Sequence, residues 1–358
     1  MSYNEAQFRI GACMRRLGAA LLVAGLMSLP AISRNEPPVP IARPNTDLRS
    51  SESEVLAPSA PIPRPQLPPQ MITFTGGVGV QFDVPYSSPA GSRPLTLDLY
   101  APQPSPIPMP IVLYVHGGGW NSGDSRHALP FSDFPQALAR LASNGYLVAS
   151  VNYRLSQQAH FPAALQDVKT AIRWLRDHAS DYGCDPTRLG VWGMSAGGQL
   201  AAMAGTRCGV PRFEPDANAG FNAPSDCVEA VIDWFGPMDL EGLGDGEVAQ
   251  YLGCEPANCP PVVARLASPR TFISETTPPF LIQQGSADTV VVPEQSQKLY
   301  EALRRKAVPA EIVIYPGVGH GFMKDGKPDP DTVTKALARL SDFLAVTFPN
   351  APLKATKK

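Results

Sequence analysis

The chain has 358 residues, with 30 basic and 32 acidic side chains and a formal net charge of −2 at pH 7. This near-neutral balance lacks the electrostatic footprint that nucleic-acid binding requires, so we expect no nucleic-acid partner. The part of the chain from residue 71 to residue 349 is long enough to bury the core of one domain, and we expect a single domain there.

The first 33 residues have the pattern of a secretory signal peptide. Arg15 and Arg16 precede the apolar run Leu17–Leu29, which is too short to cross a bilayer comfortably, and small residues follow it. We therefore expect residues 1–33 to be removed and the protein to be secreted or periplasmic, without stable membrane insertion after cleavage. A retained anchor helix is the alternative, and the polar residues before Met14 leave open a start of translation there.

Residues 34–70 form a proline-rich segment, with ten prolines between positions 37 and 70. Proline removes backbone donors and fixes φ, so such a segment makes neither a helix nor a central strand. We expect a disordered linker at 34–70, and a flexible tail at residues 350–358.

From residue 71 onward, strand-like and helix-like segments alternate. Residues 73–84 and 95–100 are expected to be antiparallel first strands. Further strands are expected at 111–115, 146–152, 189–193, 228–235, 279–284 and 311–315, and helices at 132–143, 163–178, 196–204, 294–306 and 331–346. This alternation predicts an α/β fold, with a mostly parallel central sheet and helices on both faces.

A glycine run, Gly117-Gly118-Gly119, lies between His116 and Trp120 and directly follows a buried strand-like run. Glycines let backbone N–H groups approach a substrate oxygen closely. A phosphate loop is disfavoured, because the run has neither a Gly-Lys-Ser/Thr ending nor dinucleotide-binding spacing. We interpret the run as an oxyanion-binding loop that His116 holds in place.

Ser195 lies in Gly193-Met194-Ser195-Ala196-Gly197, between a strand-like run and a helix-forming run. Strand, tight turn with serine at its apex, then helix is the pattern of a nucleophile elbow, in which the flanking positions must be small. The helix N-terminus and the Ala196 N–H would favour negative charge beside the serine. The alternative is a small-residue turn in which serine caps the helix.

A base and an acid would have to follow the serine in chain order. His320 lies in a glycine-rich loop directly after the strand-like run 311–315. Functional residues of an α/β sheet lie in loops at the carboxyl ends of its strands. Asp288 follows the preceding strand, so its loop and that of His320 should be neighbours. Asp239 is the rival acid, and a helix-capping turn residue is the alternative role for Asp288.

Aromatic residues stand beside these loops. Trp120 and Phe322 are candidate substrate-binding residues, and Trp234 and Phe235 also lie nearby. Packing in the core is the alternative for each of them.

These motifs resemble α/β-hydrolases of the hormone-sensitive-lipase-like type, and most closely the BD-FAE family of bacterial esterases, which includes feruloyl and acetyl-xylan esterases. The resemblance runs from about residue 96 to the C-terminal helix. It implies Ser195 as nucleophile, Asp288 as orienting acid and His320 as base, with Gly118, Gly119 and Ala196 as oxyanion donors. Which two of the three loop glycines donate stays open. The lipase-like branch usually has aspartate where this chain has Met194, which favours the BD-FAE branch.

The resemblance implies a secreted serine carboxylesterase that needs no cofactor or metal. We expect short-chain acyl esters as substrates, as small molecules or on polysaccharide, because the insertion 207–226 lacks an amphipathic lid helix. Acetyl or feruloyl esters of plant polysaccharide follow from the resemblance alone. The alternatives are a serine peptidase of the prolyl-oligopeptidase type and a non-catalytic binding protein on the same fold.

Five cysteines follow the expected signal. In an oxidising compartment we expect Cys208 to pair with Cys227 and Cys254 with Cys259, because both pairs lie in loop-like insertions. Cys184 would then be a free thiol. Metal binding is disfavoured, since no pair has Cys-x-x-Cys spacing.

Overall fold

The computed structural model describes residues 71–74, 76–210, 213, 224–243, 246–256 and 258–349. All of them belong to the compact unit Pro65–Lys358. The expected signal peptide (1–33), linker (34–70) and tail (350–358) lie outside the described residues. Among the helices of the described part, none combines the length and the apolar character that crossing a membrane requires.

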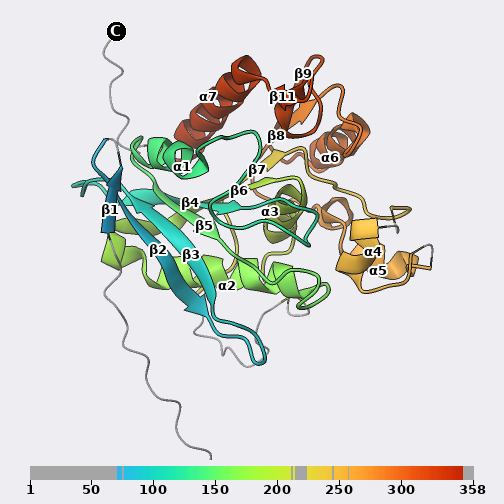
Figure 1. Ribbon diagram of the computed structural model, residues 1–358, viewed down its shortest axis with the longest axis horizontal. Helices are drawn as coiled ribbons and strands as arrows, with labels where there is room; N and C mark the ends of the chain where they lie inside the picture. The colour runs from blue at the N-terminus through green and yellow to red at the C-terminus, as the bar shows by residue number, and fades with distance from the viewer. Residues whose placement is uncertain are drawn as a thin grey trace, which may run out of the picture. The chain divides into compact units, whose positions relative to one another are not determined.

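The described residues form a sheet of nine strands in the order β1-β2-β3-β5-β4-β6-β7-β8-β9 (Figure 1). The first three strands pair antiparallel, β3 pairs antiparallel with β5, and all pairs from β5 to β9 are parallel. The strands are β1 (Met71–Phe74), β2 (Val78–Ser87), β3 (Leu95–Ala101), β4 (Met109–Val115), β5 (Leu147–Val151), β6 (Cys184–Met194), β7 (Ala230–Trp234), β8 (Phe280–Gly285) and β9 (Ala310–Tyr315).

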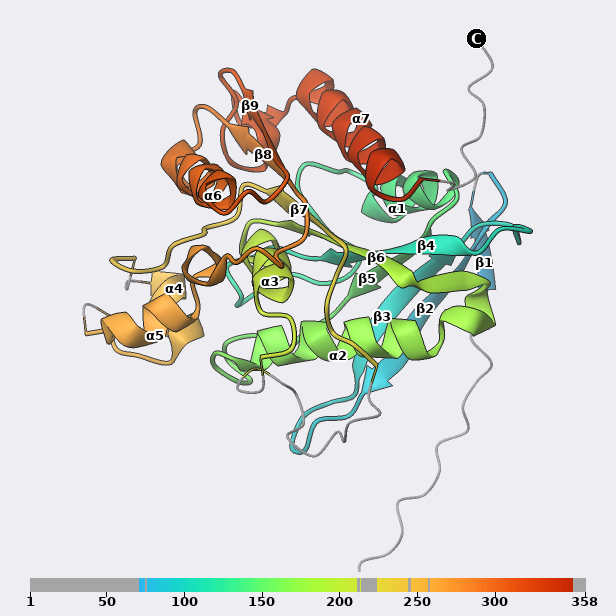
Figure 2. The same cartoon turned by 180° about the vertical axis from the view of Figure 1, so that it is seen from behind.

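Helices cover both faces of this sheet. Figure 2 shows α1 and α7 on one side and α2 on the other. The longer helices are α1 (Phe134–Ala142), α2 (Ala163–Asp177), α3 (Ala196–Thr206), α6 (Pro293–Arg305) and α7 (Pro330–Thr347). Shorter elements are α4 (Gly246–Leu252), α5 (Pro261–Leu266), the 3-10 turns η1 (Ala179–Tyr182), η3 (Pro269–Phe272) and η4 (His320–Phe322), and the hairpin β10 (Met323–Lys324) and β11 (Lys327–Pro328).

The two faces of β4 belong to two separate hydrophobic cores. Ile111 and Leu113 pack in the core that contains residues of α2, α3 and α6. Val112 and Tyr114 pack in the core that contains residues of α1 and α7. Side chains alternate between faces along a strand, so a strand buried on both sides is apolar at every position. The expected α/β fold with helices on both faces is confirmed.

Two local expectations were wrong. Residues 73–84 were expected to form one strand, whereas the chain turns at Gly76–Gly77 and β1 pairs back on β2 as a hairpin. The connection between β7 and β8 was expected to be irregular, and it contains α4 and α5. Both helices are short, so neither shows the long apolar periodicity by which a helix is recognised in sequence.

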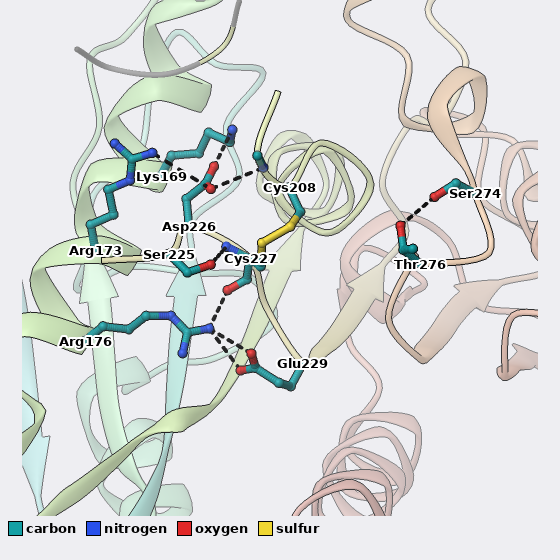
Figure 3. The surroundings of a disulfide bond; sticks show 11 residues. Lys169, Arg173, Arg176, Cys208, Ser225, Asp226, Cys227, Glu229, Ser274 and Thr276 are labelled. Atoms are coloured by element: carbon teal, nitrogen blue, oxygen red, sulfur yellow. Dashed lines mark hydrogen bonds and ion pairs between the residues drawn. A yellow bond between two sulfur atoms is a disulfide. The ribbon is translucent and has the colours of Figure 1, made fainter. Parts of the chain in front are cut away.

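The structure contains the disulfide Cys208–Cys227, which joins the segment after α3 to the segment before β7. Figure 3 shows polar groups of α2 facing that second segment. Lys169 forms an ion pair with Asp226, and the Arg176 guanidinium donates to the backbone carbonyl of Cys227. The disulfide and the charges of α2 therefore hold the same segment.

The second expected disulfide, Cys254–Cys259, is also present and closes the connection between α4 and α5. Cys184 is a free, buried cysteine at the start of β6. Burial raises the pKa of its thiol to about 12, because the thiolate would lose its hydration. Cys184 is therefore a protonated, unreactive thiol.

Candidate active site

The three residues expected to carry the chemistry follow three strands of the parallel part of the sheet. Ser195 follows β6, Asp288 lies shortly after β8, and His320 comes after β9. Parallel strands end at one edge of a sheet, so residues far apart in the chain meet there.

These three side chains form one hydrogen-bonded chain. His320 Nε2 lies 2.9 Å from Ser195 Oγ, and His320 Nδ1 lies 2.8 Å from Asp288 Oδ2. A carboxylate facing Nδ1 favours the tautomer with the proton on Nδ1, which leaves Nε2 free to accept the serine proton. The carboxylate of the rival acid Asp239 instead accepts from Arg270, and the Asp239 backbone N–H donates to Gln295 Oε1.

The Asp288 carboxylate is held from several directions. It is 3% exposed, and its Oδ1 accepts from the amides of Val290 and Val291, each at 2.9 Å. Gln284 Nε2 donates to Asp288 Oδ2 at 3.0 Å, while Gln284 Oε1 accepts from Ser296 at 3.0 Å. These donors fix the carboxylate that faces His320.

Gln284 was not predicted from the sequence. It is fully buried within β8. The available signal was the pair of amide side chains, Gln283 and Gln284, at the end of a strand that is otherwise apolar, because a buried polar group needs a partner.

The turn at Ser195 has the geometry of a nucleophile elbow. Ser195 has φ 54° and ψ −123°, backbone angles that residues other than glycine rarely adopt. A Cβ on Gly193 would collide with the Gly197 carbonyl, and a Cβ on Gly197 would collide with the Val115 carbonyl. Ala196 is the first residue of α3, so its N–H has no acceptor within the helix.

The glycine loop lies beside the serine. Gly117, Gly118 and Gly119 line the same cavity as Ser195 and His320. A Cβ on Gly117 would lie 3.3 Å from the Ser195 Cβ, which places the start of the loop next to the serine. The glycine loop and the first turn of α3 therefore both lie next to Ser195.

His116 has a structural role in this loop. Its Nδ1 donates to the Gly117 carbonyl at 2.7 Å, and its ring stacks on Tyr153 with centroids 4.2 Å apart. The Tyr153 hydroxyl donates to the His116 carbonyl at 3.0 Å. Burial lowers the pKa of His116 to about 4, since the charged ring would lose its hydration. The imidazole is therefore neutral near pH 7.

The cavity above Ser195 has a volume of about 880 Å³. One part of its wall is aromatic, with Tyr114, Phe134 and Phe235. The Phe235 ring also meets the His320 ring edge-on, with centroids 4.9 Å apart. Glu247, on α4, contributes a carboxylate to the wall and was not predicted from the sequence.

The structure does not bring Trp120 and Phe322 to the cavity, so their expected substrate-binding role is corrected. Trp120 is 3% exposed, donates from Nε1 to Gln199 Oε1 at 3.1 Å and stacks on Tyr251. Phe322 is fully buried and packs against Trp234. Both residues have positive φ, 58° and 52°, and both side chains lie in the core instead of the cavity wall. The presence of an aromatic residue beside a loop does not reveal whether its side chain points into the cavity or into the core.

A family model, known protein sequences and solved structures all match this chain. The BD-FAE family model matches residues 97–303. Esterase LipC from Mycobacterium tuberculosis is 34% identical over 237 residues, which cover 63% of this chain and 56% of LipC. Esterase LipQ from the same organism is 29% identical over 279 residues, covering 74% of this chain and 62% of LipQ. The chain thus spans less than two thirds of the length of these relatives.

Two solved structures are similar over most of the described residues. A truncated carbohydrate esterase from gut microbiota has a TM-score of 0.65 and 28% identity, covering 75% of this chain and 95% of that chain. An acetyl ester-xyloside bifunctional hydrolase from Caldicellulosiruptor lactoaceticus has a TM-score of 0.58 and 26% identity, covering 74% and 91% respectively.

Proposed function

The chain belongs to the BD-FAE family and has the α/β-hydrolase fold, and from this premise we propose that it is a serine carboxylic ester hydrolase. The observation that carries the proposal is the hydrogen-bonded chain from Ser195 through His320 to Asp288. Acyl transfer needs a nucleophile in contact with a base, and a third group that orients the base.

In the proposed reaction, His320 Nε2 takes the proton of Ser195 as Oγ attacks the ester carbonyl. The oxyanion of the tetrahedral intermediate accepts hydrogen bonds from the amides of Ala196 and of the loop glycines Gly118 and Gly119, each donor lowering the barrier by roughly 3 kcal/mol. His320 then gives its proton to the leaving alcohol, and the acyl group stays on Ser195. Water repeats the sequence and releases the acid.

Asp288 orients His320 throughout the proposed cycle. It holds the Nδ1 proton of His320 and stabilises the imidazolium that forms twice in each turnover. The donors from Val290, Val291 and Gln284 keep its carboxylate in place during these proton transfers.

We propose short-chain acyl esters as the substrates, with acetyl or feruloyl esters of plant polysaccharide as the natural class. The names of two similar structures support a carbohydrate ester, one being a carbohydrate esterase and the other an acetyl ester-xyloside hydrolase. The insertion that was expected to lack a lid, 207–226, lies mostly outside the described residues. The two disulfides support a secreted or periplasmic location, because such bonds persist in oxidising compartments.

The test is steady-state hydrolysis of p-nitrophenyl esters from acetate to palmitate, by the wild type and by Ser195→Ala. We expect acetate and butyrate to react far faster than palmitate, and Ser195→Ala to lose on the order of a millionfold in kcat. Ser88→Ala, at an exposed position beyond β2, is the control. Residual activity of a few per cent in Ser195→Ala would place the nucleophile elsewhere, and faster palmitate hydrolysis would indicate a lipase. Cleavage of aminoacyl amides in preference to esters would favour a peptidase.

A further inference from the structure

A carboxylate lies against the glycine loop of the cavity. Glu247 is in the first turn of α4, in the connection between β7 and β8. A Cβ built on Gly119 would overlap the Glu247 carboxylate, so the carboxylate lies directly against this glycine. Glu247 lines the same cavity as Ser195 and His320.

The charge of Glu247 has no cationic partner among the described residues. Arg126 lines the cavity, but its Nε lies 2.8 Å from Asp98. His127 also lines the cavity, and its Nδ1 lies 2.9 Å from Asp124. The basic side chains Arg126 and His127 are therefore bound by other carboxylates.

Glu247 is exposed at the cavity wall, and an unpaired carboxylate there disfavours negative charge in the cavity, most strongly at low ionic strength. An ester without a hydrogen-bond donor gains nothing from the Glu247 carboxylate, and an anionic ester is repelled by it. An ester with a free hydroxyl near Glu247 can donate a hydrogen bond to it, and hydrogen bonds to ionised acceptors are about twice as strong as neutral ones.

The cavity wall has both apolar and charged parts. Leu129, Phe131 and Val290 provide exposed or partly exposed apolar surface. Glu247 provides an acceptor with no apolar character. An acylated polyol is divided in the same way, since its acyl group is apolar and its alcohol part has hydroxyl groups.

We propose that Glu247 is a specificity-determining residue that accepts a hydrogen bond from a hydroxyl group of a neutral, polyhydroxylated alcohol, such as a partly acylated sugar, and disfavours anionic esters. This inference rests on the proposed ester hydrolase function and adds the residue that recognises the alcohol.

The test uses four acetate esters, with acetate release as the common readout. Methyl xyloside monoacetate has free hydroxyls, cyclohexyl acetate has a ring of similar size without them, 4-acetoxybutyrate is anionic, and acetylcholine is cationic. Values of kcat/KM are measured for the wild type, Glu247→Ala and Glu247→Gln. Glu255→Ala is the matched control, because it removes an exposed carboxylate from the same connection without lining the cavity.

We expect the ratio of kcat/KM for the xyloside to that for cyclohexyl acetate to fall about tenfold in Glu247→Ala, the effect of one lost hydrogen bond to a charged group. Glu247→Gln keeps an acceptor and should show a smaller fall. Both variants should gain on 4-acetoxybutyrate relative to cyclohexyl acetate, and Glu255→Ala should keep the wild-type ratios.

Three results would overturn the inference. The first is an unchanged xyloside ratio in Glu247→Ala with esters still hydrolysed, which leaves the ester hydrolase function standing. The second is a larger fall for acetylcholine than for the xyloside, which would make the carboxylate a cation site. The third is a wild type that hydrolyses none of these esters nor p-nitrophenyl acetate, which would remove the proposed function itself.

Discussion

Replacing His116 with asparagine should make the fold less sensitive to acid. The imidazole is 1% exposed and stacked on Tyr153, and its Nδ1 donates to the Gly117 carbonyl. Burial lowers its pKa from the ordinary 6.5 to about 4. An asparagine amide can still donate a hydrogen bond and takes up no proton in this range.

The direction of the effect follows from which state takes up the proton first. As the pH falls below about 6.5 the unfolded imidazole is protonated while the folded one stays neutral, so stability is lost down to about pH 4 and changes no further below it. At pH 4.5 the unfolded state is favoured by a factor of about 60 relative to pH 7, which is about 2.4 kcal/mol.

Urea unfolding at pH 7 and at pH 4.5 measures this contribution. The wild type should lose about 2.4 kcal/mol more between the two conditions than His116→Asn does. Taking the difference between conditions removes any constant destabilisation of the variant. His127→Asn, which removes an exposed imidazole from the same loop, is the control. Equal losses in the wild type and His116→Asn would refute the burial of a neutral imidazole beside the glycine loop.

Three further outcomes are expected. Asp288→Asn should lower kcat for p-nitrophenyl acetate roughly ten-thousandfold by permitting the wrong histidine tautomer, whereas Asp239→Asn, at a residue bound to Arg270, should change it little; the reverse order would reassign the acid. Gln284→Leu should lower kcat about tenfold with little change in KM, because Asp288 loses a donor; an unchanged kcat would make Gln284 dispensable. Iodoacetamide at pH 8 should not label Cys184 in the native protein, because its pKa of about 12 keeps the thiol protonated, and rapid labelling seen by mass spectrometry would contradict this.

The residues at the ends of the sheet strands were predictable because local signals mark them. The elbow around Ser195 requires small residues at fixed spacing, and apolar runs followed by glycine-rich loops indicate where strands end before Asp288 and His320. Parallel topology then brings these loops together, as the hydrogen bonds of His320 show. The sequence therefore determined the fold class and the order of these three residues.

The tertiary structure alone decided which side chains line the cavity. Trp120 and Phe322 stand beside the right loops, yet both lie in the core. Glu247 reaches Gly119 from a distant helix too short to be recognised, and Gln284 reaches Asp288 from inside a buried strand. The direction of a side chain depends on its own backbone angles and on packing against residues remote in the chain, and neither is encoded in the spacing of a local motif.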